Sequence, residues 1–301
     1  MRALIVAFIA LFLAAPAEAF ESRMLRIEHD GLERRALMDA RADVRSAPVL
    51  LVLHGGIAGP ETVRRRARVG LAREGWIVLW PYAVDDWNDG RTTRSGAPYD
   101  NADDIGFMRA LVADLARRGM ADPERVFVAG PSLGGTMALR FLCDAPDFIA
   151  GAAVAIASLP QGKTCPPGPP RPILYIHGTD DGIMPPDGGR IGGSSIFIRD
   201  RGRVASVDET LGILARRNGC AGFEESRVPD RSTDDGSSVR LRDYRGCDEP
   251  LRHFIIDGGG HTWPGSRSSS LGGSLIGATN QDISATREVE TFFKDIAARL
   301  R

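Results

Sequence analysis

The sequence lacks an excess of charge of either sign. It holds 38 lysine and arginine residues against 39 acidic residues, for a net charge of −1 at pH 7. Lysine is nearly absent, with only Lys163 and Lys294, and we attribute this bias to genomic composition rather than to function. A chain without a basic excess has no signature of binding to nucleic acid or anionic lipid, so we expect neither partner.

Long apolar runs are lacking too. The N-terminal stretch MRALIVAFIALFLAAPAEAF has one basic residue, Arg2, an apolar run over residues 3–15 and then the tripeptide AEA. The run is shorter than the roughly 20 residues that a membrane-spanning helix needs. A charged start, a short apolar centre and an A-x-A exit predict a secretory signal peptide over residues 1–19. We therefore expect a secreted or periplasmic protein without a stable membrane anchor.

Cysteine is scarce but even in number, with four residues. In an exported chain this count predicts two disulfides, for which three pairings are possible. The local pairing joins Cys143 to Cys165 and Cys220 to Cys247, and each bond would add very roughly 3 kcal/mol on the chain-entropy model. Neither pair has Cys-x-x-Cys spacing, so we expect structural disulfides without redox chemistry.

The mature chain, residues 20–301, is expected to form a single α/β domain, because no repeat or linker divides it. Apolar segments typical of buried strands alternate with segments of helical periodicity. The expected strands are residues 48–53, 76–80, 126–129, 173–176 and 251–256. The expected helices are residues 103–118 (with Asn101 as the N-cap), 136–143, 207–217 and 285–300. This alternation predicts a mostly parallel sheet with helices on both faces.

Four unusual segments each follow one of these strands. They are HGG, GPSLGG, HGTDDG and GGGHTWPG. Active sites of open parallel sheets lie beyond the carboxyl ends of the strands, so the four segments should converge on one edge. Two glycine- and serine-rich stretches, residues 188–195 and 265–277, are expected to be surface loops near that edge.

The segment RVFVAGPSLGGTMALRFL, residues 125–142, places one serine, Ser132, between an expected strand and an expected helix. A strand-to-helix turn needs glycine and tolerates serine, so a purely structural role is one interpretation. The other is a nucleophile elbow, Gly-x-Ser-x-Gly, which holds a hydroxyl above a sheet. A serine nucleophile needs a histidine base and an acid that orients the histidine.

His261 is the favoured base among the five histidines, because it follows three glycines after the last strand. His54 and His177 precede glycine at strand ends and could shape turns. His253 is inside a strand, and His29 has no catalytic context. The order serine, acid, histidine is that of the α/β-hydrolase fold.

Asp180 and Asp181 compete for the role of the acid. We favour Asp181, because the glycine that follows it can let the chain turn away and leave the carboxylate facing the site. The expected oxyanion donors are the N–H of Leu133, directly after the serine, and that of Gly56 or Ile57 in the HGG segment. These groups complete the chemistry, so no metal and no organic cofactor is expected.

Seven segments that span nearly the whole mature chain carry a family resemblance. They are LVLHGG, WNDGR, NADDIGFMRALV, DPERVFVAGPSLGGTMALRFLC, YIHGTDD, RRNGC and DGGGHTWPG. In these the chain resembles the exported esterases of the polyhydroxybutyrate-depolymerase type, which include feruloyl and acetylxylan esterase relatives. The resemblance implies an α/β-hydrolase fold, Ser132 as the nucleophile, Asp181 as the acid, His261 as the base and the local cysteine pairing. Pro131 departs from the bulky apolar residue that usually precedes the nucleophile.

The leading hypothesis is a secreted serine carboxylic-ester hydrolase that works through an acyl-enzyme. No separate binding module follows the last expected helix, which favours 3-hydroxyalkanoate oligomers or other small esters over solid polymer. The alternative is a feruloyl or acetylxylan esterase acting on plant cell-wall esters. Trp87 and Trp263 could stack on an aromatic acyl group, or serve packing alone.

Two further readings stay open at this point. One is a hydrolase of another bond, such as a peptidase, on the same fold. The other is a non-catalytic binding protein on a hydrolase scaffold, which would normally have lost a member of the triad. The sequence does not indicate an oligomeric state.

Overall fold

The computed structural model describes residues 20–56, 58–92, 100–192, 201–266 and 276–300. The expected signal peptide lies outside these ranges and stays a prediction. Among the described residues, no helix combines the length and apolar character needed to cross a membrane.

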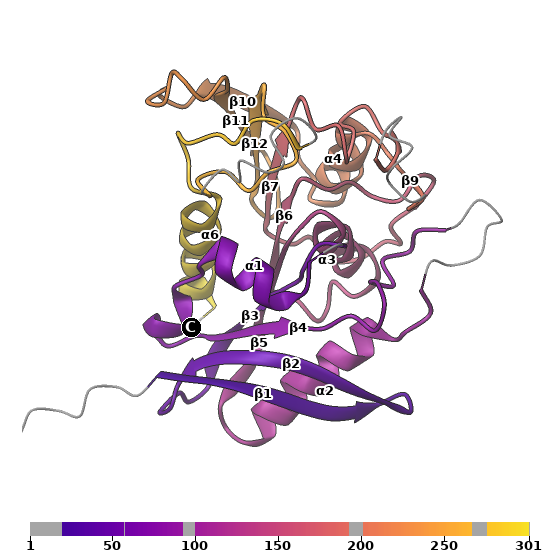
Figure 1. Ribbon diagram of the computed structural model, residues 1–301, viewed down its shortest axis with the longest axis vertical. Coiled ribbons are helices and arrows are strands. Elements are labelled where there is room, and N and C mark those ends of the chain that lie inside the picture. The colour runs from indigo at the N-terminus through magenta and orange to yellow at the C-terminus, as the bar shows by residue number, and fades with distance from the viewer. Residues whose placement is uncertain (1–19, 57, 93–99, 193–200, 267–275, 301) are drawn as a thin grey trace, which may run out of the picture.

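A ten-stranded sheet runs through the centre of the molecule, in the order β1-β2-β4-β3-β5-β6-β7-β12-β11-β10 (Figure 1). Its interior strands pair in parallel. They are β4 (Ile77–Pro81), β3 (Ala47–Val52), β5 (Ala121–Pro131), β6 (Gly151–Ala155), β7 (Ile173–Gly178) and β12 (Leu251–Asp257). Strands buried on both faces need apolar residues at successive positions, which explains the continuous apolar runs of the sequence.

Antiparallel hairpins extend the sheet at both ends. One consists of β1 (Phe20–His29) and β2 (Leu32–Arg41), and the other of β10 (Gly222–Arg227) and β11 (Ser238–Arg245). A separate two-stranded sheet pairs β8 (Gly189–Arg190) with β9 (Arg203–Val204).

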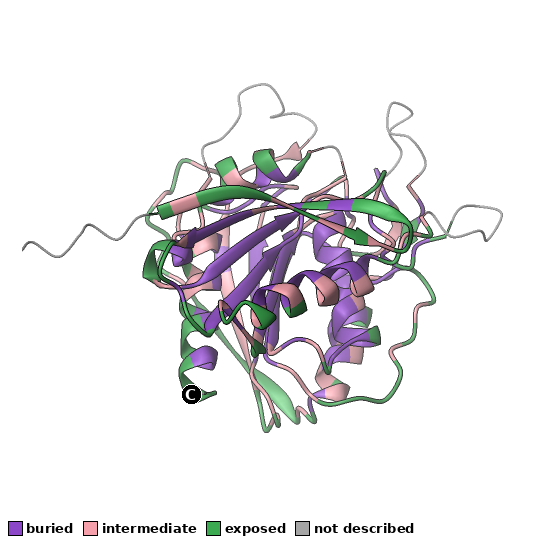
Figure 2. Cartoon of the chain, turned by 90° about the horizontal axis from the view of Figure 1, so that it is seen from below, coloured by how far each residue is buried: buried purple, intermediate pink, exposed green. Residues whose placement is uncertain are grey.

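Helices cover both faces of the sheet and enclose two apolar cores. The first core lies under α2 (Asp104–Arg117), α3 (Leu133–Asp144) and α4 (Val207–Arg217). The second lies under α1 (Pro60–Ala67), the short 3₁₀ helix η1 (Leu71–Glu74) and α6 (Ala285–Arg299). Figure 2 shows the strands buried between these layers.

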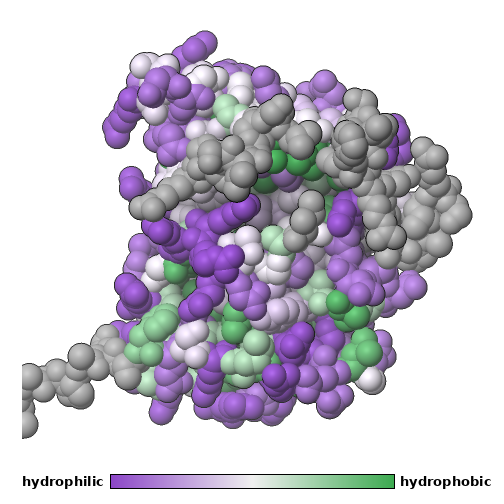
Figure 3. Space-filling view, viewed as in Figure 1, coloured by the Kyte–Doolittle hydropathy of each residue, from purple (hydrophilic) through white to green (hydrophobic). Residues whose placement is uncertain are grey.

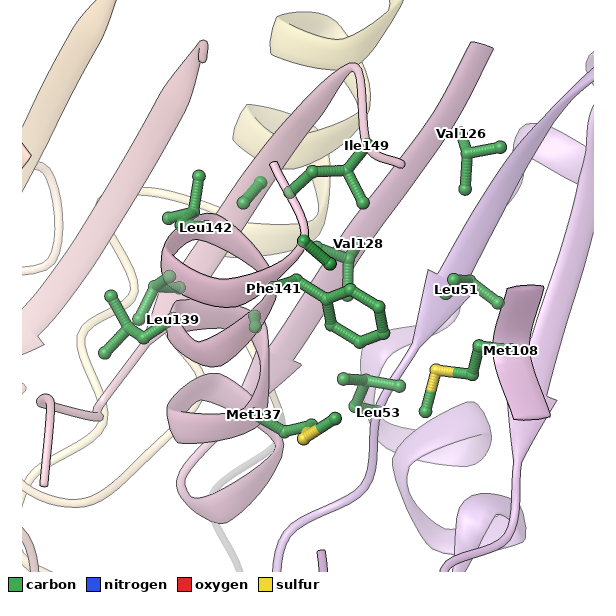
Figure 4. Packing of buried hydrophobic residues seen from close by; sticks show 14 of the residues in the cluster. Leu51, Leu53, Met108, Val126, Val128, Met137, Leu139, Phe141, Leu142 and Ile149 are labelled. Carbon is green, nitrogen blue, oxygen red and sulfur yellow. The ribbon is translucent and has the colours of Figure 1, made fainter. Parts of the chain in front are cut away.

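Alternate side chains of β3 point into different cores, as the two-residue period of a strand requires. Val49 and Leu51 belong to the first core and Leu50 to the second. In Figure 4, Phe141 of α3 points toward the strands, and Met108 of α2 approaches the same core from a second helix. All these side chains are fully buried, so α3 is packed firmly onto the strands that carry the site.

The predicted α/β class and mostly parallel sheet are confirmed. One local prediction is wrong: the N-cap of α2 is Asp103, not Asn101. The Asp103 carboxylate accepts a hydrogen bond from the Gly106 N–H at 2.9 Å. A cap must reach the N–H groups two or three residues ahead, and Asn101 stands two residues too early.

Both disulfides of the local pairing are present in the structure. Cys143, in the last turn of α3, is bonded to Cys165, and Cys220 is bonded to Cys247.

Candidate active site

Ser132 sits at the corner between β5 and α3 with φ of 55° and ψ of −129°. This left-handed region is costly for a residue with a side chain and persists only where the surroundings enforce it. At Ser132, hydrogen bonds on both sides of the residue hold the backbone in this conformation. The Ser132 N–H donates to the Ala155 carbonyl at 2.9 Å, and the Ser132 carbonyl accepts from the Thr136 N–H at 2.9 Å.

The glycines around Ser132 are needed because backbone segments approach closely. A Cβ added to Gly130 would lie 2.5 Å from the carbonyl carbon of Gly134. One added to Gly134 would lie 2.3 Å from the carbonyl oxygen of Leu53. Pro131 pairs in register with Ala155 at the end of β5, so the strand exit accommodates the unusual proline.

We expect Gly134→Ala to lower the free energy of unfolding by about 3 kcal/mol, the upper end of ordinary overpacking, because its new methyl group meets backbone. Gly182→Ala is the matched control, since a Cβ there meets nothing within 4 Å. Denaturant unfolding of both variants measures the difference. Equal stability of the two would contradict the crowding argument.

Ser132, His261 and Asp181 form one hydrogen-bonded chain, although they come from three separate loops. The Ser132 Oγ lies 3.0 Å from Nε2 of His261, and Nδ1 of His261 lies 2.7 Å from Oδ2 of Asp181. An ionised carboxylate can only accept, so Nδ1 carries the ring proton and Nε2 is left to accept from the serine hydroxyl. This is the arrangement that a histidine base requires.

The two neighbouring aspartates differ completely in surroundings. Asp181 is 4% exposed, and its second oxygen accepts from the N–H groups of Ile183 and Met184 at 2.9 and 2.8 Å. Asp180 is exposed, and its Oδ1 accepts from the Thr179 hydroxyl at 3.0 Å. Of the two aspartates, only Asp181 forms a hydrogen bond with His261.

Two of the expected oxyanion donors lie beside Ser132. Leu133 is the first residue of α3, and N–H groups in the first turn of a helix have no acceptor within the helix. Gly56 lines the same cleft and lies against the Leu133 side chain, where a Cβ would come within 2.4 Å of Cδ1. Ile57, the other expected donor, lies outside the described residues.

The chain is similar in sequence to esterases. No family model matches the chain. NocK of Nocardia uniformis subsp. tsuyamanensis, a predicted esterase, is 29% identical over 247 residues, which are 79% of this chain and 71% of NocK. Feruloyl esterase B of Piromyces equi is 27% identical over 226 residues, 72% of this chain but only 40% of the relative.

The solved acetyl xylan esterase from Aspergillus awamori superposes with a TM-score of 0.58 at 14% identity, covering 90% of this chain and 98% of that enzyme. The chain has the α/β-hydrolase fold. In this fold a nucleophilic serine, an acid and a histidine follow in that chain order, and Ser132, Asp181 and His261 come after the parallel strands β5, β7 and β12.

Of the two interpretations of Trp87, the structure favours packing over stacking on substrate. Trp87 is 0% exposed, its Nε1 donates to the His54 carbonyl at 2.8 Å, and the two rings lie 4.7 Å apart. It therefore packs beneath the HGG segment. Trp263 does line the cleft, 9% exposed, with its Nε1 donating to the Thr286 hydroxyl at 3.0 Å.

Three of the other histidines have hydrogen-bond partners other than Ser132. His54 bonds the Gly55 carbonyl at 2.9 Å, and burial lowers its pKa. His177 and His253 share a hydrogen bond of 2.7 Å in the sheet. Burial lowers the pKa of His177 to about 4 and lowers that of His253 as well, so the pair is neutral at neutral pH.

The cleft above Ser132 has a volume of about 540 Å³. Apolar side chains, among them Val63, Ile156 and Ile183, form much of its wall. Its lining also includes two arginines, Arg66 and Arg201, which were not among the predicted site residues. Within the described part of the chain, no group of three or more histidine, cysteine or acidic residues could hold a metal ion.

Proposed function

We propose that the protein is a serine carboxylic-ester hydrolase that works through an acyl-enzyme. The observation that carries this proposal is the hydrogen-bonded chain from Ser132 through His261 to Asp181, open to the cleft. A non-catalytic binding protein would have no use for a buried carboxylate aligned behind a histidine, which costs free energy to desolvate.

In the first half of the proposed reaction, the Ser132 Oγ attacks the ester carbonyl as its proton passes to Nε2 of His261. Asp181 stabilises the imidazolium that forms. The carbonyl oxygen gains negative charge and is met by the N–H groups of Leu133 and Gly56. The tetrahedral intermediate collapses, and the alcohol leaves with the proton from His261.

In the second half, water takes the place of the alcohol. His261 accepts a proton from the water as the water attacks the acyl-enzyme. When the bond to the acyl carbon breaks, His261 returns the proton to the Ser132 Oγ and the carboxylic acid is released. The positive φ of Ser132 lifts its side chain clear of the sheet, so both attacks can take place from the cleft.

For the substrate, we propose small esters, including 3-hydroxyalkanoate oligomers. Feruloyl or acetylxylan ester hydrolysis is supported at least as well, because the relatives bear those names. The burial of Trp87 removes one of the two aromatic surfaces suggested for ferulate. Two disulfides fit an oxidising compartment, so we also propose export through the N-terminal segment.

A hydrolysis panel tests the proposal. We expect turnover of p-nitrophenyl butyrate, and the relative rates on 3-hydroxybutyrate oligomers and methyl ferulate should separate the two substrate classes. A short peptide amide is the control and should remain intact, as the esterase relatives suggest. A correctly folded protein that does not hydrolyse p-nitrophenyl butyrate would contradict the proposal.

A further inference from the structure

Two cationic side chains line the cleft that holds Ser132, and the described lining contains no acidic side chain. Arg66 comes from the last turn of α1, and Arg201 comes from the segment before β9. The residues outside the described ranges add little negative charge, since after residue 19 they include one acidic residue, Asp200, against four arginines.

Arg66 differs from its neighbours on α1. Arg64 makes a two-pronged ion pair with Asp39 at 2.6 and 2.7 Å, and Arg65 donates to the Thr62 hydroxyl at 3.2 Å. Arg66 lines the cleft and forms no ion pair with any described residue. Figure 3 shows hydrophilic side chains gathered over α1.

Arg201 lies against the oxyanion segment. A Cβ on Gly56 would come within 2.4 Å of Nη1 of Arg201, which places the guanidinium directly beside that glycine. The same Nη1 donates to Oδ2 of Asp86 at 3.0 Å, and this oxygen also accepts from Arg91 at 3.2 Å. Asp86 therefore holds Arg201 in place while being shared with a second cation. Arg201 has no other hydrogen-bond acceptor among the described residues.

The Arg201 side chain is 24% exposed, so in a cleft with apolar walls it loses part of its hydration, and an anion there would recover the lost interaction. Arg66 is exposed and adds a second positive charge to the same cleft. The planar donors of arginine match the two oxygens of a carboxylate. Resting on the ester hydrolysis proposed above, we propose that the cleft selects esters that carry a carboxylate, with Arg66 and Arg201 as the residues that determine this specificity. The free-acid end of a hydroxy-acid oligomer is one group of this class.

The test uses an isosteric pair of methyl esters. Monomethyl adipate carries a carboxylate at its far end, and methyl adipamate carries an amide there. At neutral pH we expect wild-type kcat/KM to be about tenfold higher on the acid, and the preference to shrink as salt is added. Arg66→Gln should lower kcat/KM on the acid about fivefold through KM, with kcat nearly unchanged, and leave the amide within twofold.

Arg65→Gln is the matched control, because it removes the same charge from the adjacent position, which is also exposed but lies outside the cleft lining. It should keep the full preference for the acid. Arg201→Gln, checked for folding by circular dichroism, should reduce the preference as well.

The outcomes separate the two proposals. Hydrolysis of p-nitrophenyl butyrate with equal kcat/KM on acid and amide would overturn the carboxylate selectivity alone. So would an equal loss of the preference in the Arg65 and Arg66 variants. No hydrolysis of p-nitrophenyl butyrate would overturn ester hydrolysis, and the selectivity with it.

Discussion

Replacing Ser132 with alanine is expected to lower turnover of p-nitrophenyl butyrate on the order of a million-fold, the scale of losing the nucleophile in serine hydrolases. Turnover should be lost because the nucleophile is missing, since no other hydroxyl is bonded to Nε2 of His261 in the described structure. The fold should remain, since the Ser132 side chain makes no capping bond to α3 and alanine bears the same positive φ at similar cost. Labelling by a fluorophosphonate probe should disappear together with turnover.

Ser266→Ala is the control for this experiment. Ser266 lines the same cleft, but its hydroxyl forms no hydrogen bond with His261. This variant should keep turnover within about twofold, as an ordinary surface change would. Wild-type turnover in the Ser132 variant, or loss of labelling in the Ser266 variant, would place the nucleophile elsewhere.

Replacing Asp181 with asparagine is expected to lower kcat by roughly 10³–10⁴, whereas Asp180→Asn should cost less than about tenfold. The Asp181 carboxylate accepts from Nδ1 of His261 at 2.7 Å. An amide can turn its NH₂ toward that nitrogen and stabilise the wrong tautomer, with the proton on Nε2, which then cannot accept from Ser132. Asp180 has no contact with the ring.

The substitution at position 181 should not unfold the loop that holds it. Asparagine at position 181 retains one carbonyl oxygen for the N–H groups of Ile183 and Met184, so the loop should keep its turn. Steady-state kinetics on p-nitrophenyl butyrate, with circular dichroism as the folding check, measures the ranking. The reverse order would make Asp180 the acid.

The interior of the fold could be predicted from the sequence, and its edges could not. Strands such as β3 and β7 are buried on both faces, so their residues must be apolar in succession and stand out as continuous runs. The strand β10 is exposed at all of its positions and carries mostly polar residues, so it gave no such run. The hairpin β1–β2 was missed for the same reason, because one side of β1 faces solvent.

The candidate site also has residues that could be predicted from the sequence and residues that could not. Chain order and strand ends were enough to select Ser132 and His261 and to limit the acid to Asp180 or Asp181, because parallel topology brings these positions to one edge. The choice of Asp181 needed the glycine that follows it and the family resemblance. The burial of Trp87 could not be predicted, since nearness in sequence to a site loop does not say on which side a ring packs. Arg66 was missed because an arginine in the last turn of a helix normally points to water and to the helix dipole.

The helix α3 is held at both of its ends. At its start Gly134 lies close to the backbone of Leu53 and His54, just after β3, and in its last turn Cys143 is bonded covalently to Cys165. Nearly every side chain between them is buried. Amide hydrogens of this helix should therefore exchange with solvent only when the whole domain unfolds, while exposed β10 exchanges through local opening. The slowest-exchanging segment of the molecule would then be the helix that directly follows Ser132, the residue that we propose as the nucleophile.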